Sequence, residues 1–83
     1  MPYIDKEKRP QMDYVVNEMC WRDVSPDGSL NYILFKYCKE YLEPSYDNYK
    51  NYIGELNECV AEIRRRLLAP YEDQKIKEHG DVT

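Results

Sequence analysis

The strongest constraint in this 83-residue chain is a series of apolar side chains spaced three or four residues apart between residues 49 and 67. Residues at these spacings share one face of an α-helix. The members of this stripe are Tyr49, Tyr52, Ile53, Leu56, Val60, Ile63 and Leu67. We therefore predict one long helix, capped by Ser45 and reaching about Leu68.

Shorter stretches of the same periodicity predict a helix from about Arg9 to Trp21 and another from about Leu30 to Leu42. Between them, Ser-Pro-Asp-Gly-Ser over Ser25–Ser29 predicts a turn, because Pro restricts φ and Asp-Gly favours a chain reversal. Pro70 is expected to end the long helix and to begin a short C-terminal one, which stops at Gly80.

No segment alternates with a period of two residues, so the predicted fold class is all-α, with three main helices plus a short C-terminal helix. Residues 1–83 are expected to form one small domain, with residues 1–9 as an extended N-terminal arm. The chain has nine tyrosines, whose apolar rings and polar hydroxyls suit surfaces that a partner covers. We therefore expect a helical bundle completed by oligomerisation, as a homo-dimer or a larger homo-oligomer.

The net charge limits the classes of partner that the chain is expected to bind. Twelve Lys and Arg stand against sixteen Asp and Glu, a net charge of −4, which is unsuited to binding duplex nucleic acid through its phosphates. No apolar run has the ~18 residues of a membrane span, so no membrane association is expected. Three cysteines in no C-x-x-C pattern indicate a reducing, cytoplasmic location without a disulfide framework.

The charged residues on and after the long helix allow three interpretations. The first is a solvated helix face with ion pairs between residues one turn apart. The second is a metal site: Glu55 and Glu58, followed by Glu78 and Asp81, resemble the acidic signature of the all-α MazG-type nucleoside triphosphate pyrophosphohydrolases. That resemblance implies that all four carboxylates bind Mg²⁺ and that water attacks the nucleotide. Gly80 departs from the signature, because it lies inside the second pair.

The third interpretation is a phosphate-binding surface. Arg65 and Arg66 near the end of the long helix, with Tyr71 and Lys75 beyond Pro70, supply the guanidinium, ammonium and aromatic groups that hold a phosphate and a base. Asn31 and Tyr32 lie at a predicted helix start, where exposed amides can hold an anion. The chain has a single histidine, His79, and the sequence does not indicate a Cys–His or Ser–His–Asp catalytic set around it.

A second resemblance covers nearly the whole chain. The segments MPYIDKEKR, LNYILFKYC and RRRLLAPYEDQKIKEHGDV are similar to a family of small proteins encoded by phages and by bacteria. It implies a phage-type accessory protein in the host cytoplasm. We therefore expect a non-enzymatic protein that binds or sequesters a phosphate-bearing small ligand, such as a nucleotide or a cyclic-nucleotide immune signal, or that binds a host protein. The alternative is the MazG-like hydrolase.

Overall fold

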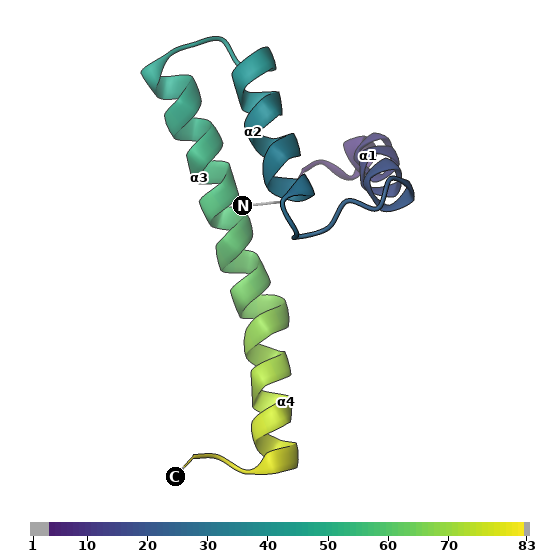
Figure 1. Ribbon diagram of the computed structural model, residues 1–83, viewed down its shortest axis with the longest axis vertical. Helices are drawn as coiled ribbons and strands as arrows, with labels where there is room; N and C mark the ends of the chain where they lie inside the picture. The colour runs from purple at the N-terminus through teal and green to yellow at the C-terminus, as the bar shows by residue number, and fades with distance from the viewer. Residues whose placement is uncertain (1–3, 83) are drawn as a thin grey trace. The chain divides into compact units, whose positions relative to one another are not determined.

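The computed structural model describes residues 4–82, and every regular element in this range is helical (Figure 1). The prediction of an all-α fold is therefore confirmed. The elements are, in chain order, η1 (Lys6–Lys8), α1 (Arg9–Trp21), α2 (Ser29–Tyr41), α3 (Tyr46–Ile63), η2 (Arg64–Leu68) and α4 (Ala69–His79).

The beginning of the chain is more ordered than the sequence suggests. Residues 6–8 form a 3₁₀ turn, in which the Lys8 N–H donates to the Asp5 carbonyl at 3.0 Å, where we predict an extended arm. The turn leads directly into α1, whose first turn accommodates Pro10 because a proline near a helix start needs no N–H partner. The first three residues of the predicted arm lie outside the described residues. The predicted bounds of α1 agree with the structure.

The turn predicted at Ser25–Ser29 is present, and side chains tie it to α2. The Asp27 carboxylate accepts the Ser29 backbone N–H at 3.2 Å, which lowers the pKa of the Asp27 carboxyl, and the Ser29 hydroxyl donates to the same carboxylate. Gly28 has a φ of +114°, a conformation that L side chains rarely adopt. Helix α2 consequently begins at Ser29, one residue before the predicted start.

Helix α3 begins where the sequence predicts, because the Ser45 hydroxyl accepts the backbone N–H of Asn48 at 3.0 Å. Its end is different. The prediction that Pro70 ends the long helix is wrong: α3 passes through the π-helical η2 into α4 without a break (Figure 1). The Ala69 N–H bonds the carbonyl of Arg64, five residues earlier. A π turn holds one more residue than an α turn, which gives the ring of Pro70 room in a helix that continues.

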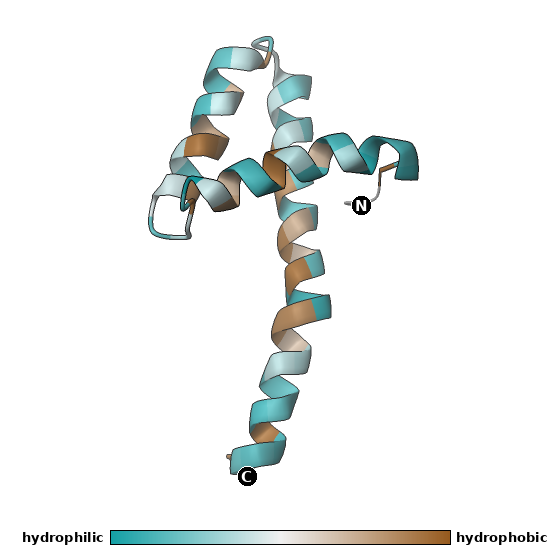
Figure 2. Ribbon diagram, turned by 90° about the vertical axis from the view of Figure 1, so that its right-hand side faces the viewer, coloured by the Kyte–Doolittle hydropathy of each residue, from teal (hydrophilic) through white to brown (hydrophobic). Residues whose placement is uncertain are grey.

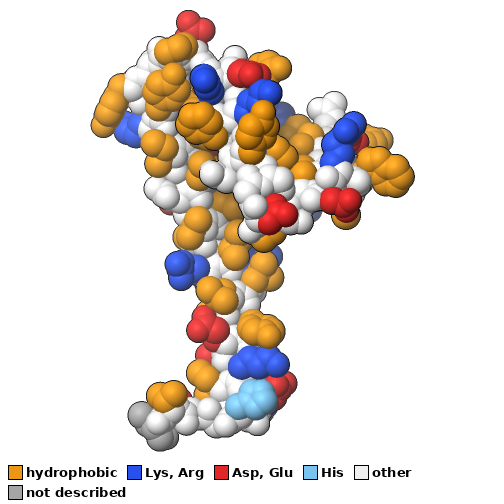
Figure 3. All heavy atoms as spheres, viewed as in Figure 1, with side chains coloured by type: hydrophobic (Ala, Val, Ile, Leu, Met, Phe, Trp, Pro, Cys, Tyr) orange, Lys and Arg blue, Asp and Glu red, His pale blue; other side chains and the backbone are white. Residues whose placement is uncertain are grey.

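Side-chain burial is low throughout the described residues. None of them is buried, and Trp21, for example, is 83% exposed. Hydrophobic side chains, drawn in orange, lie on the surface in Figure 3. Cys20, Cys38 and Cys59 are free thiols. Between residues 4 and 82, no helix combines the length and the apolar character needed to cross a membrane.

Contacts divide the chain into two units that meet within α3, after Lys50. The first unit contains η1, α1, α2 and the first turn of α3. In the second, the described residues from 51 to 82 form one helical run and a short tail, and brown apolar segments recur along it in Figure 2. The single domain over residues 1–83 stays a prediction.

Replacing Asp27 by Ala should lower the melting temperature and remove part of the acid sensitivity of the fold. Because the folded-state pKa of Asp27 lies below its ordinary value, the contribution of the carboxylate is fully present above about pH 4 and is lost as the pH falls through the lowered value. Circular dichroism melts from pH 7 to pH 3 measure this effect. Asp13→Ala in α1 is the matched control, and equal pH profiles for the two variants would contradict the assignment.

Replacing Pro70 by Ala should stabilise the junction of η2 and α4. The new N–H can donate to an earlier carbonyl, so that the π turn can relax towards α-helix. We expect slower amide hydrogen exchange over residues 66–72, with ellipticity at 222 nm unchanged or stronger. Faster exchange, or a loss of helix over residues 69–79, would show that Pro70 supports the helix instead of interrupting its hydrogen bonds.

Candidate functional site

The end of α1 builds an apolar groove in the first unit. Asp23 has a φ of +57°, its N–H bonds the carbonyl of Cys20 at 3.1 Å, and the N–H of Val24 bonds the carbonyl of Met19 at 3.0 Å. This is a Schellman ending, which commonly brings apolar side chains at these two positions together. Met19 and Val24 both line the groove.

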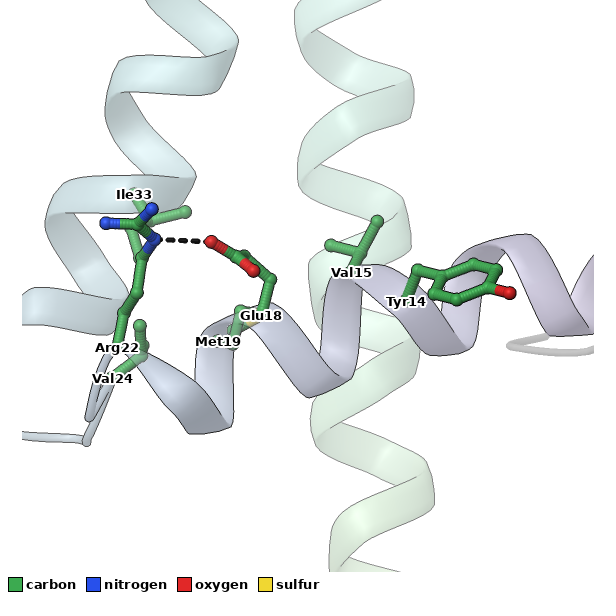
Figure 4. Close-up of a pocket in the computed structure, with 7 residues that line it drawn as sticks. All are labelled: Tyr14, Val15, Glu18, Met19, Arg22, Val24 and Ile33. Carbon is green, nitrogen blue, oxygen red and sulfur yellow. Dashed lines mark hydrogen bonds and ion pairs between the residues drawn. The ribbon is translucent and has the colours of Figure 1, made fainter.

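The groove has a volume of about 420 Å³, is open to solvent, and draws its walls from α1, the following loop and α2. Figure 4 shows its lining residues, which are Tyr14, Val15, Glu18, Met19, Arg22, Val24 and Ile33. Val15 is 55% exposed and Ile33 is 37% exposed, although both are aliphatic. The groove can therefore receive an apolar side chain from another molecule.

One ion pair accompanies these apolar walls. The Arg22 Nε donates to a Glu18 carboxylate oxygen one turn earlier on α1 (Figure 4). Both side chains are mostly exposed, at 72% and 57%, so the pair itself adds little to stability. It does place a charged donor and a charged acceptor beside the groove, where they can orient a polar group on a bound segment.

The predicted phosphate-binding residues form two separate clusters in the second unit. In the first cluster, Arg65 Nη2 lies 2.9 Å from Glu62 Oε2, and Arg66 Nη1 lies 3.8 Å from the same oxygen. The two guanidinium groups help to cover Glu62, whose side chain is only 17% exposed. Arg66 and Glu62, with Ile63 and Leu67, line a shallow hollow. A phosphate entering here would compete with the Glu62 carboxylate for both arginines.

The second cluster lies on α4. Lys75 Nζ lies 5.5 Å from the ring centroid of Tyr71, within the range of a cation–π contact, and 3.3 Å from Glu78 Oε2. The predicted neighbours Tyr71 and Lys75 are therefore in contact. The ammonium is already paired with a carboxylate, so this cluster presents little net positive charge to an anion.

The backbone N–H groups at the start of α2 already donate hydrogen bonds to groups of the same chain. The backbone N–H groups of Ser29, Leu30 and Tyr32 donate to Asp27, Ser25 and Gly28, respectively. The Tyr32 hydroxyl accepts a hydrogen bond from Lys36 at 3.2 Å, which raises the pKa of Lys36, with a smaller effect from Glu40. Asn31 is exposed in the first turn. These bonds leave few amide donors for the anion that we expected near Asn31 and Tyr32.

The four carboxylates of the predicted magnesium site are not brought together within one chain. Glu55 and Glu58 lie on α3, whereas Glu78 lies near the end of α4, on the same continuous helical run. At 1.5 Å per residue, Glu55 and Glu78 are about 34 Å apart along the axis. Asp81 follows Gly80, whose φ of +84° ends the helix. In residues 4–82, no cluster of three or more His, Cys, Asp or Glu is arranged to hold a metal ion.

The sequence interpretation missed the groove. Its apolar positions on α1 were recognised as a helix stripe, but the groove depends on the reversal after Trp21, which the spacing of apolar residues does not reveal. An Asp followed by an apolar residue at a helix end was the available signal, because Asp tolerates positive φ and the next residue can pack back on the helix.

Comparison with known proteins gives one match. A family model described as "Domain of unknown function (DUF6899)" matches residues 1–82 of the chain. No curated protein and no solved structure matches the chain.

Substitutions at Glu62 and Arg66 should have opposite effects on anion binding. Glu62→Gln removes the competing carboxylate and should tighten binding of ATP, whereas Arg66→Ala should weaken it by about ten- to a hundredfold, since a charged hydrogen bond contributes ~1.5–3 kcal/mol. Both dissociation constants can be measured by NMR titration at low ionic strength. Lys6→Ala is the control. If none of these substitutions changes ATP binding, the cluster is only a solvated helix face.

Proposed function

The chain belongs to the DUF6899 family, and from its surfaces we propose that it is a non-enzymatic accessory protein that binds a host protein through the groove between α1 and α2. The observation that carries this proposal is the exposure of aliphatic side chains in a hollow with a built wall on each side. The hollow is made by a defined helix ending and not by a frayed segment.

The chemistry of the groove indicates the kind of segment that it binds. Val15, Met19 and Ile33 offer an apolar surface, and Met adapts its shape to different side chains. An amphipathic helix of the partner, with one large apolar side chain as an anchor, fits such a surface. The Glu18–Arg22 pair beside the groove would select a partner with a polar residue close to that anchor.

The resemblance to small phage and bacterial proteins gives this binding a biological setting. A phage-type accessory protein acts in the host cell, so that a host protein is the natural partner, and interference with a defence system is one role that such binding can serve. The host-protein partner and the role against a defence system are both proposed from the resemblance and the groove together.

A second candidate function is binding of a phosphate-bearing ligand, including a nucleotide or a cyclic nucleotide, at η2. The observation that favours it is the hollow beside Arg66, whose guanidinium lies 3.8 Å from Glu62 and so is less firmly held than that of Arg65 at 2.9 Å. Arg66 could turn to a phosphate while Arg65 keeps Glu62 paired. The substitutions at Glu62 and Arg66 described above test this candidate.

Photo-crosslinking tests the groove directly. A benzophenone amino acid in place of Tyr14, which lines the groove, should give one discrete protein adduct in bacterial cells. The same amino acid in place of Tyr46 should not, although the two tyrosines are similarly exposed, at 75% and 79%. Adding Val15→Asp to the chain that carries the crosslinker at position 14 places a charge on the apolar wall and should reduce the adduct by about tenfold. Equal adducts from both positions, or an adduct insensitive to Val15→Asp, would overturn the proposal.

A further inference from the structure

Helix α3 and the following η2 carry a heptad pattern that the groove does not use. From Tyr49, the apolar residues follow at alternating intervals of four and three: Tyr49, Ile53, Leu56, Val60, Ile63 and Leu67. Ile53 and Val60 occupy one of the two core positions of a heptad, called a, and Leu56 and Ile63 occupy the other, called d. We call these six residues the α3 seam.

The α3 seam is largely uncovered. Val60 is 50% exposed, Ile63 is 47% exposed and Leu67 is 66% exposed. Within the second unit, the described residues supply no other helix to cover them, because residues 51–79 are a single helical run. An isolated helix of this kind gains most of its stability from packing its apolar face, so the α3 seam needs a partner.

The seam is long enough for a helix pair. Helix α3 has 18 residues, about 27 Å of axis at 1.5 Å per residue. Apolar side chains recur along it once per turn, and Ile53 among them is 56% exposed. One copy of the chain can therefore cover the α3 seam of another.

The first heptad of the seam favours two parallel strands. β-Branched residues at a, here Ile53 and Val60, with Leu56 at d are the combination that favours parallel dimers, whereas Ile63 at d departs from it. The heptad positions called g and e flank the core of a helix pair. In a parallel pair, Tyr52 at g lies beside Asn57 at e of the second copy, and Cys59 at g lies beside Arg64 at e of the second copy, so that no like charges meet. An antiparallel pair with the full seam overlapped would instead set Lys50 beside Arg64 of the second copy, twice.

We propose that two copies of this chain associate through the α3 seam as a parallel, in-register helix pair. The proposal concerns a surface separate from the α1–α2 groove and does not depend on what binds there. At the C-terminal end of the pair, Leu67, the last residue of the seam, is followed in η2 by Leu68, which is 41% exposed.

Sedimentation equilibrium of the full chain tests the association. At tens of micromolar we expect a mass of about 20 kDa, twice that of the 10.0 kDa chain. Val60→Asp should raise the dissociation constant by about a hundredfold or more, because it buries a charge in the interface. Val16→Asp in α1 is the matched control, since Val16 is also half or more exposed, and it should leave the mass at that of the dimer. A monomeric wild-type chain, which would mean that α1 or α2 covers the seam, would overturn the proposal.

Disulfide trapping tests the orientation independently of any disruptive substitution. The test uses a chain in which Cys20, Cys38 and Cys59 are changed to Ser. In a parallel pair, each seam residue lies beside the same residue of the second copy. Leu56→Cys alone and Val60→Cys alone should therefore each oxidise to a covalent dimer. In an antiparallel pair, Leu56 would face Val60 of the second copy, and only a mixture of the two variants would give a covalent dimer. That outcome would overturn the parallel arrangement.

Discussion

A helix cannot bury its own apolar face, and this constraint governs the whole molecule. The helices of this chain carry apolar stripes, yet no side chain among residues 4–82 is buried. A chain of this size has little internal volume in which to hide such surface. Both proposals above follow from this condition, because the apolar surfaces of the groove and of the α3 seam become stable when another molecule covers them.

Two departures from regular helix decide where the surfaces lie. At the end of α1, the positive φ of Asp23 turns the chain so that Val24 joins Met19 in the groove. Near the end of the long helix, the π turn of η2 lets the backbone pass Pro70, so that α4 extends α3. A sharp break at Pro70 would instead have given a separate short helix, free to fold back towards Glu55 and Glu58.

Local ion pairs reduce the net positive charge that the basic residues of η2 and α4 present to solvent. Arg65 and Arg66 share Glu62, and Lys75 pairs with Glu78 while it contacts Tyr71. A run of three arginines in sequence is thus less electropositive in the structure than its residues indicate, because carboxylates three or four residues away lie beside it. The same proximity makes Glu62 the residue that offsets the positive charge of Arg65 and Arg66.

The sequence by itself determined the helical class, the bounds of α1, the cap at Ser45 and the turn before α2, because each depends on residues within one or two turns of each other. It also determined that Tyr71 and Lys75 would meet, since they are one helical turn apart. Only the tertiary structure decided the rest. The course of the backbone past Pro70 depends on a π turn that no residue type specifies, and it sets Glu55 and Glu78 about 34 Å apart. The groove joins Val15 to Ile33 across a reversal whose geometry comes from the hydrogen bonds of Asp23 and Val24, which periodicity does not encode.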